Sequence, residues 1–529
     1  MLKILVSDPI SEIGLKKLLA APDIELDIKT NLQPDQLKQL IGNYDGLLVR
    51  SQTTVTGETL EQAKRLKVIG RAGVGVDNID IEAATAKGVV VINAPDGNTI
   101  STAEHSFAML MAVSRWIPQA HEDLKHGVWN RKKYVGVELN RKTLGIIGLG
   151  RIGTEVAKRA KAFNMQVIGY DPYLSEERAK QLGVKLCSVQ EVTEQADFIT
   201  VHTPLTKDTK YIIDDREFSL MKKGVRIVNC ARGGIISEQA LLRALNEGIV
   251  AAAALDVYEE EPPGENQLIS HPNVVTTPHL GASTEEAQLN VAIDVAEEVY
   301  HYLRGEPFRN AVNLPSVTSE VLNHVRPYVR LADKLGVLIA NYIHGAINKI
   351  EIQIAGDIAE NEVNILTRSV QKGILSQHLG SIGVVNDVNA PLLAKNRGID
   401  VVESRTSKSS GFTNLMTVRV KTNREEKQIS GTVLNGYGER IVNLNGYTVD
   451  LIPEGNLIIM DHTDQPGIIG KMGSVLGNAN VNIATMQVGR NELGGKAIAF
   501  LGVDQIVDKE TLEELRQVKG IQNIYQVKL

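Results

Sequence analysis

The segment from residue 142 to 171, KTLGIIGLGRIGTEVAKRAKAFNMQVIGYD, constrains the fold more than any other part of the chain. A short apolar run leads into three glycines, Gly148, Gly150 and Gly153, with G-x-G-x-x-G spacing. An amphipathic segment with helical spacing follows, and a second apolar run ends at Asp171. This order of strand, glycine turn, helix and strand predicts a parallel α/β sheet of the Rossmann type.

The three glycines serve different purposes in such a turn. Gly148 allows the strand to turn sharply, Gly150 lets the backbone approach a pyrophosphate, and Gly153 lets the helix pack closely against the strand. The free N–H groups at the start of the helix then face the phosphates. Asp171 follows about 20 residues after the first glycine, where a carboxylate can bond both ribose hydroxyls and repel a 2′-phosphate. We therefore predict a dinucleotide site that prefers NAD to NADP; the alternative is a glycine turn without a phosphate.

Composition limits the class of protein. With 529 residues, the chain is too long for one core, and its length predicts three or four domains. A net charge of −6 disfavours nucleic-acid binding, and no apolar run reaches the length of a membrane span. The two cysteines, Cys187 and Cys230, lie far apart and outside any C-x-x-C pattern, which indicates a reducing, cytoplasmic location. The histidines show no metal-ligand spacing, so we expect no metal.

The first part of the chain predicts a parallel α/β layer of its own. Residues 1–93 alternate short β-rich runs with helical patterns. Arg50, Arg71 and Asn98 follow such runs, and ligands of open α/β sheets bind at the carboxyl ends of strands. These residues are therefore candidates for substrate contacts, with a solvated surface cation as the alternative for each arginine. The segment GRAGVGVD at residues 70–77 lacks a third glycine, and we predict a loop at the edge of the site.

After the glycine turn, four more segments have the pattern of a strand followed by a loop, and each strand end delivers polar groups. In chain order these groups are His202 with Thr203, then Arg232, then Asp256 with Glu260 and Glu261, and finally His279. We expect them at one edge of the sheet, beside the nicotinamide half of the cofactor. Between the two layers, Thr99 to about Gln119 predicts one long connecting helix, and residues 127–140 predict a partly buried loop.

Three of these groups match the needs of 2-hydroxy acid oxidation. A base must take the hydroxyl proton, and imidazole titrates near physiological pH, so His279 suits this task. Glu261 can hydrogen-bond the second ring nitrogen and favour the protonated form. Arg232 presents a planar fork of donors that clamps a carboxylate. The alternatives are a capping histidine, a surface glutamate and a phosphate contact, but three successive strand ends together favour catalysis.

Four motifs, found in this order, resemble the D-isomer-specific 2-hydroxyacid dehydrogenase family: GLGRIG, ARGGII, DVYEEEP and TPHLGAST. The resemblance covers about residues 1–313 and implies that Arg232, Glu261 and His279 are catalytic. The family glutamate precedes a proline, which selects Glu261 over its neighbour. The cofactor contacts that the resemblance implies are Gly148, Gly150, Arg151, Ile152, Gly153, Asp171, Thr203, Cys230, Ala231, Asp256, Gly281 and Ala282. One departure is Val74, where some members have a threonine hydroxyl.

The full length resembles the long members of this family, in which a middle domain and a C-terminal ACT domain follow the catalytic part. This resemblance implies NAD-dependent oxidation of 3-phospho-D-glycerate to 3-phosphohydroxypyruvate, which opens the phosphorylated route to L-serine. It also implies feedback by L-serine at a site shared by paired subunits of a homodimer or homotetramer. The implied substrate contacts are Arg50, Arg71, Asn98 and Arg131 or Lys132, and the implied serine contacts are His462, Asp464 and Asn482.

The expected fold class is α/β, with a Rossmann doubly wound nucleotide domain inserted in a flavodoxin-like substrate domain. An α+β domain and a ferredoxin-like ACT domain follow. A helix from Val317 to His344, hairpin signals at Asn435-Gly436 and Asn445-Gly446, and a final βαββαβ pattern support the last two. The predicted boundaries are 1–98 with 284–313 for the substrate domain, 99–283 for the NAD-binding domain, 317–453 for the middle domain and 455–529 for the ACT domain.

Two other functions stay open at this stage. Another 2-hydroxy acid enzyme, such as a glyoxylate or hydroxypyruvate reductase, is disfavoured because such enzymes are usually short. A non-catalytic NAD-sensing scaffold of the same fold is disfavoured by the complete set of arginine, glutamate and histidine.

Overall fold

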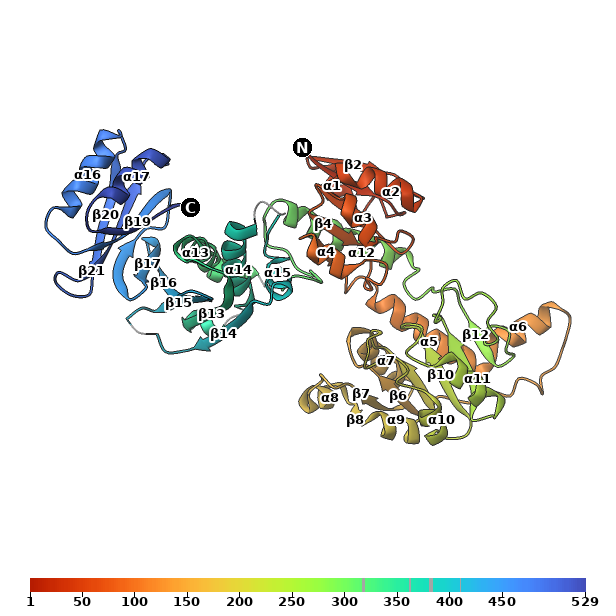
Figure 1. Ribbon diagram of the computed structural model, residues 1–529. Helices are drawn as coiled ribbons and strands as arrows, with labels where there is room; N and C mark the ends of the chain where they lie inside the picture. Colours follow the sequence, from red (N-terminus) through yellow and green to blue (C-terminus); the bar gives the residue numbers. More distant parts are fainter. Residues whose placement is uncertain (316–318, 361–362, 380–383, 410) are drawn as a thin grey trace.

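The computed structural model of the chain describes residues 1–315, 319–360, 363–379, 384–409 and 411–529. Within these ranges the chain forms four β-sheets, which follow one another along the sequence (Figure 1). We number them the first to the fourth sheet. Among the described residues, no helix combines the length and the apolar character that crossing a membrane requires.

The first sheet is parallel and has the strand order β2-β1-β3-β4-β5. This order is that of flavodoxin-like folds, as predicted. Each predicted strand is present, and the buried strands have almost continuous apolar runs, as strands covered on both faces require. The elements are β1 (Leu2–Val6), α1 (Lys16–Leu19), β2 (Ile24–Ile28), α2 (Pro34–Leu40), β3 (Gly46–Val49), α3 (Gly57–Gln62), β4 (Val68–Arg71), α4 (Ile81–Ala86) and β5 (Val90–Asn93).

The second sheet is also parallel, with the order β12-β11-β10-β9-β6-β7-β8. Numbered from β6, this is the Rossmann order 3-2-1-4-5-6 with one more strand. The order reverses between β6 and β9, which is where such sheets bind ligands. The elements are β6 (Thr143–Ile147), α7 (Arg151–Ala162), β7 (Gln166–Tyr170), α8 (Glu176–Leu182), β8 (Lys185–Leu186), α9 (Val189–Gln195), β9 (Phe198–Val201), α10 (Asp215–Leu220), β10 (Val225–Asn229), α11 (Glu238–Asn246), β11 (Val250–Leu255) and β12 (Val274–Thr276).

The connection between the two sheets differs from the predicted single helix. Helix α5 (Thr99–Arg115) ends where Trp116 takes a left-handed conformation with φ of 56°, and α6 (Ile117–Lys125) begins directly after it. Pro118 has no N–H to continue the first helix, so the chain turns instead. The loop after α6 was also predicted to be partly buried, and this is wrong for its tryptophan, because Trp129 is 76% exposed.

Helix α12 (Glu285–Leu303) returns the chain to the first sheet, as the sequence predicts. Its residues Val291, Val295 and Val299 share a hydrophobic core with Ile4 and Val68. The chain then forms a bridge to β5 before leaving this unit. The unit built on the second sheet is thus inserted in the unit built on the first, while the exact boundaries stay a prediction.

The third sheet is mixed and has the order β14-β13-β15-β16-β17-β18. Only the β13–β14 pair is parallel in the described part of this sheet, and the hairpins predicted at Asn435-Gly436 and Asn445-Gly446 join β16 to β17 and β17 to β18. The predicted helix begins at Ser319 in the structure, and its residues 317 and 318 lie outside the described ranges. The elements are α13 (Ser319–Tyr342), β13 (Ile347–Gly356), α14 (Asn364–Leu379), α15 (Ala390–Asn396), β14 (Asp400–Thr406), β15 (Asn414–Thr422), β16 (Glu426–Leu434), β17 (Gly438–Leu444) and β18 (Tyr447–Leu451).

The fourth sheet is antiparallel, with the order β20-β21-β19-β22 and the predicted βαββαβ connectivity. Its strands pack on the third unit, because Phe500 and Tyr525 belong to the same hydrophobic core as Leu335 of α13. The Tyr342 hydroxyl donates to Asp461 Oδ1 over 2.9 Å at this junction. The elements are β19 (Asn456–Thr463), α16 (Ile468–Asn478), β20 (Ile483–Arg490), β21 (Lys496–Val503), α17 (Lys509–Gln517) and β22 (Ile521–Lys528).

Candidate active site

The glycine turn has the geometry that the sequence pattern predicts. Gly148 has φ of +95°, and a Cβ there would lie 2.6 Å from the carbonyl oxygen of His202. A Cβ at Gly153 would lie 2.0 Å from the carbonyl oxygen of Gly148, so helix and strand could not approach as they do. At Gly150 a Cβ would meet no described atom within 4 Å. Helix α7 therefore starts at an open edge, where a larger group can come close to the backbone.

Several features around this turn fit a dinucleotide. A pocket of about 480 Å³ opens at the start of α7, next to Gly150 and Arg151. Asp171, directly after β7, accepts hydrogen bonds from the backbone N–H of Leu149 and of Tyr173, both over 2.9 Å. On the opposite side the buried hydroxyl of Thr203 has no hydrogen-bond partner among the described residues. The turn is therefore firmly held and retains unused polar groups that a bound NAD can satisfy.

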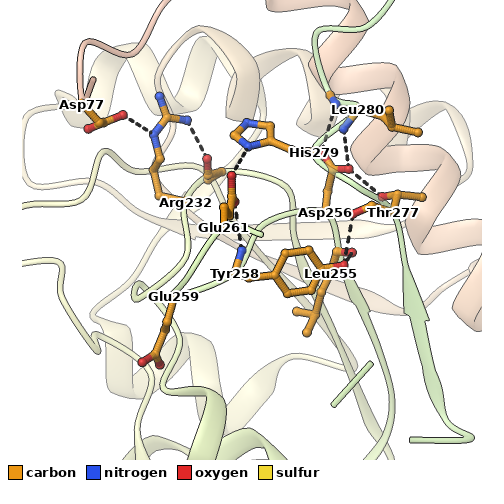
Figure 2. A network of polar contacts seen from close by, with 12 residues as sticks. Asp77, Arg232, Leu255, Asp256, Tyr258, Glu259, Glu261, Thr277, His279 and Leu280 are labelled. Carbon is orange, nitrogen blue, oxygen red and sulfur yellow. Dashed lines mark hydrogen bonds and ion pairs between the residues drawn. The ribbon is translucent and has the colours of Figure 1, made fainter. Parts of the chain in front are cut away.

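His279 and Glu261 are paired across two loops that follow neighbouring strands. Figure 2 shows the imidazole Nδ1 of His279 facing Glu261 Oε2 over 2.7 Å. The backbone N–H of Tyr258 donates to the other oxygen, Glu261 Oε1, over 3.1 Å. Burial alone would raise the pKa of Glu261, but the hydrogen bond and the charge of His279 outweigh burial and hold that pKa below its usual value. The carboxylate therefore stays ionised and can stabilise a protonated imidazole.

Asp256 fixes the loop that carries His279. His279 has an unusual left-handed backbone, with φ of 55°. The buried carboxylate of Asp256 accepts from the N–H of Leu280 over 2.7 Å, from that of Gly281 over 2.8 Å and from the Thr277 hydroxyl over 2.6 Å. Three hydrogen bonds to one carboxylate over-determine a strained turn, so the imidazole stands in one place.

Arg232 completes the group and connects it to the first sheet. Its Nε donates to Asp77 Oδ2 over 3.0 Å, and its Nη1 donates to the carbonyl oxygen of Ala231 over 2.7 Å (Figure 2). Arg71, at the end of β4, lies close enough to Arg232 for their charges to interact. The same holds for Arg71 and Arg50, which directly follows β3. Burial, and then the nearby charge of Arg232, lower the pKa of Arg71 to about 10. The loops of the first and second sheets thus bring three arginines close to one another.

The other predicted residues differ in their surroundings. Asn98 has a buried Oδ1 without a described partner, and Arg151 pairs with Asp96 over 2.6 Å. Arg131 is exposed in the segment after α6, which Figure 1 shows at the outer side of the second unit. No hydrogen bond or ion pair of Arg131 with the described residues of the arginine group is present. Cys230 is buried, and burial and then the charge of Asp256 raise the pKa of its thiol.

Two contacting residues of this region were not found from the sequence. His105 on α5 lies 3.2 Å from Asp256 Oδ1 and forms a compact group with Asp256 and Cys230. Asp77 pairs with Arg232 from the loop that was predicted at the edge of the site. The sequence holds no signal for the first contact, because α5 has only the pattern of a core helix. The second joins loops that belong to two different sheets, which sequence spacing does not describe.

His202 carries a pH prediction. Burial lowers the pKa of His202 to about 4 in the folded chain, against an ordinary value of 6.5. Because the folded pKa is the lower one, this residue's contribution to stability is complete above pH 6.5 and is lost as pH falls towards 4. Asparagine at this position cannot gain a proton. Between neutral and acid pH we therefore expect the unfolding free energy of His202→Asn to fall by about 2 kcal/mol less than that of the parent. Urea unfolding followed by tryptophan fluorescence measures this, and His126→Asn, at an exposed residue directly after α6, should keep the parental pH dependence.

The predicted serine residues do not all lie together in one chain. His462 is on β19 and Asp464 is on the loop between β19 and α16, next to the β19 end that pairs with Lys496. Asn482 lies between α16 and β20, next to Val503 at the opposite end of β21. Asp464 Oδ2 accepts from Arg490 Nη1 over 2.9 Å and from the N–H of Gly494 over 3.2 Å. Asn482 donates to Asp504 Oδ2 over 2.8 Å. His462 is buried, and its Nε2 has no described hydrogen-bond partner.

Three family models match successive parts of the chain. Residues 107–281 match the NAD-binding domain of D-isomer specific 2-hydroxyacid dehydrogenases. Residues 324–445 match the intervening domain of D-3-phosphoglycerate dehydrogenase, and residues 456–520 match the ACT domain. The matches follow the order of the second, third and fourth sheets.

Similar proteins extend over the whole chain. The D-3-phosphoglycerate dehydrogenase of Bacillus subtilis is 48% identical over 524 residues, which cover 99% of both chains. That of Methanocaldococcus jannaschii is 46% identical over 530 residues and 100% of both chains. Among solved structures, D-lactate dehydrogenase from Aquifex aeolicus complexed with NAD and lactic acid is 30% identical, with a TM-score of 0.53 over 59% of this chain and 100% of that one. The chain therefore belongs to the D-3-phosphoglycerate dehydrogenase family of NAD-binding 2-hydroxyacid dehydrogenases.

Proposed function

We propose that His279, Glu261 and Arg232 carry out the NAD-dependent oxidation of 3-phospho-D-glycerate to 3-phosphohydroxypyruvate. The observation that carries this proposal is the 2.7 Å contact between His279 Nδ1 and Glu261 Oε2. It directs Nε2 of the imidazole towards the substrate hydroxyl, whose proton this nitrogen takes as the C2–H bond breaks. NAD, when bound, accepts the hydride that leaves C2. Glu261 stabilises the resulting imidazolium, and Arg232 holds the carboxylate of the substrate.

Phosphate recognition is assigned to Arg50 and Arg71, and Asn98 is assigned to the substrate as well. Both arginines stand at strand ends of the first sheet, Arg71 close to Arg232, and Arg71 Nε is buried without a described partner. A guanidinium with unused donors suits a phosphate. We expect kcat/KM for 3-phospho-D-glycerate to exceed that for D-glycerate by at least about a hundredfold, because the unphosphorylated acid leaves these cations unpaired. Equal values for the two acids in an assay of NADH formation would contradict the assignment.

The cofactor residues proposed for this chain surround the glycine turn and the neighbouring strand ends. Asp171 binds the ribose hydroxyls, and the start of α7 faces the pyrophosphate. The nicotinamide end lies by the loops after β9, β10 and β12. The residues are Gly148, Gly150, Arg151, Ile152, Gly153, Asp171, Thr203, Cys230, Ala231, Asp256, Gly281 and Ala282. Asp256 belongs to this set because its carboxylate holds the loop that contains Gly281.

Two glycine substitutions separate cofactor contact from folding. Gly150→Ala should leave the melting temperature unchanged, because its Cβ would meet no described atom within 4 Å, but it should weaken NAD binding by about tenfold or more. Gly153→Ala should instead lower stability by about 1–3 kcal/mol, since its Cβ would overlap the carbonyl oxygen of Gly148. Calorimetric NAD titration and thermal unfolding distinguish the two. Normal NAD affinity in a folded Gly150→Ala variant would exclude a phosphate next to this residue.

Regulation by L-serine is assigned to the fourth sheet, where the ACT match suggests an effector site. Asp464, with His462 on the preceding strand, is assigned to the ammonium group after giving up its bond to Arg490. Asn482 is assigned to the carboxyl or hydroxyl end of L-serine across a paired subunit. A site shared between paired subunits requires a homo-oligomer, either a dimer or a tetramer. The two unpaired cysteines favour a cytoplasmic location.

Substitution of Asp464 tests the serine assignment. In the parent enzyme L-serine should inhibit NADH formation, and Asp464→Asn should raise the half-inhibitory concentration by about tenfold or more, because a charge-assisted hydrogen bond is lost. Uninhibited turnover should be unchanged, since this residue lies in the fourth unit. Glu514→Gln, an exposed acid on α17 of the same unit, should keep the parental inhibition. Equal inhibition of the parent and Asp464→Asn would place the effector elsewhere.

A further inference from the structure

An ion pair between Asp77 and Arg232 joins the units of the first and second sheets. Asp77 lies on the loop after β4, and Arg232 lies on the loop after β10. Their contact, Asp77 Oδ2 to Arg232 Nε, measures 3.0 Å (Figure 2). The Asp77 side chain is 71% exposed and that of Arg232 is 30% exposed, so this acid contributes little to either core. Packing therefore does not explain why Asp77 lies beside an arginine that is proposed to face the substrate.

The loop that carries Asp77 is held by its own hydrogen bonds. Asn78 Nδ2 donates to the carbonyl oxygens of Arg50 and Thr53, over 2.8 and 2.6 Å. Asn93 Nδ2 donates to the carbonyl oxygen of Val74 over 2.6 Å. The carboxylate of Asp77 thus stands on a fixed backbone, and its contact fixes the arginine in turn.

The same contact determines which nitrogens of Arg232 remain for a ligand. A guanidinium has five N–H donors. Asp77 takes the one on Nε, and the carbonyl oxygen of Ala231 takes one on Nη1. The group also lies against Gly75, where a Cβ would be 1.8 Å from Nη2. The remaining donors all belong to the two terminal nitrogens, which is the edge that binds a carboxylate with two parallel bonds.

We propose that Asp77 is a positioning residue for the reaction, which holds Arg232 by Nε so that the terminal nitrogens face the substrate carboxylate. This inference rests on the proposed role of Arg232. A guanidinium fixed in advance loses less conformational freedom when the substrate binds, so affinity rises without any contact between Asp77 and the substrate. The contact also ties the loop after β4 to the loop after β10 while the substrate lies between the two units.

The test compares two substitutions of Asp77 in the full-length enzyme. Asp77→Ala should raise KM for 3-phospho-D-glycerate by about fivefold, the upper range for an exposed ion pair, with kcat within about twofold of the parent. Asp77→Asn should restore most of the parental KM, because its amide oxygen still accepts from Nε. Affinity for NAD should not change in either variant. Glu82→Ala, which removes an exposed acid from the start of α4 near this loop, should keep the parental KM.

A double-mutant cycle separates this inference from the assignment on which it rests. In an Arg232→Gln background Asp77→Ala should have no further effect on KM, because Asp77 acts through the arginine. A parental KM in Asp77→Ala, an Asn variant as impaired as the Ala variant, or an undiminished effect in the Arg232→Gln background would each overturn the positioning role. Parental kcat/KM in Arg232→Gln alone would instead overturn the carboxylate clamp.

Discussion

Replacement of His279 by alanine is expected to lower kcat by about 10²- to 10⁴-fold, the range of a lost general base. The imidazole is held by Glu261 on one nitrogen and by the Asp256-fixed loop at its backbone, which leaves the other nitrogen for the substrate hydroxyl. Because His279 is not part of the glycine turn, NAD affinity should stay within about twofold of the parent. Steady-state NADH formation and NAD titration on the same preparation measure both.

A matched control for His279→Ala is His324→Ala, which removes an exposed imidazole from α13. This variant should keep parental kcat and parental NAD binding. Parental turnover in His279→Ala would contradict the assignment of the base. Loss of turnover together with loss of NAD binding would indicate a damaged fold and not a missing base, and the melting temperature decides between these cases.

Arg232→Gln carries the second large effect. We expect kcat/KM to fall by about 10²- to 10³-fold, since a charge-assisted, two-bond clamp on a carboxylate is worth about 2–5 kcal/mol in a partly buried site. Arg232→Lys should recover only part of this loss, because an ammonium keeps the charge without the planar fork. The measurement is kcat/KM at several substrate concentrations below KM.

The control for Arg232 is Arg243→Gln. Arg243 lies on the exposed surface of α11 in the same unit as Arg232. It also pairs with a carboxylate, because its Nη2 lies 2.7 Å from Asp215 Oδ2. Its loss should leave kcat/KM unchanged, as exposed ion pairs contribute little. An equal effect of the two substitutions would show that lost surface charge, and not the clamp, governs activity.

Much of the fold follows from local sequence patterns. Apolar runs with glycine or polar ends predict the strands of both parallel sheets, and Asn445-Gly446 predicts its hairpin, because each signal acts over a few neighbouring residues. The family prediction is confirmed by relatives that match the full length. The rule that strand ends meet at one edge also places Arg232, Glu261 and His279 together, while their catalytic roles stay a prediction.

Other features depend on contacts between distant segments. The break at Trp116 was missed because helical spacing continues through it, although Pro118 is a local signal against one continuous helix. The contacts of Asp77 with Arg232 and of His105 with Asp256 join residues far apart in sequence, so no spacing reveals them. The shared core between α13 and the fourth sheet is of the same kind, since apolar positions alone do not identify their partner.

NADH formation from 3-phospho-D-glycerate and NAD by the purified full-length chain tests the central claim most directly. The account predicts steady turnover that requires the phosphate of the substrate and the imidazole of His279. Absence of NADH formation by a folded chain that still binds NAD would contradict it.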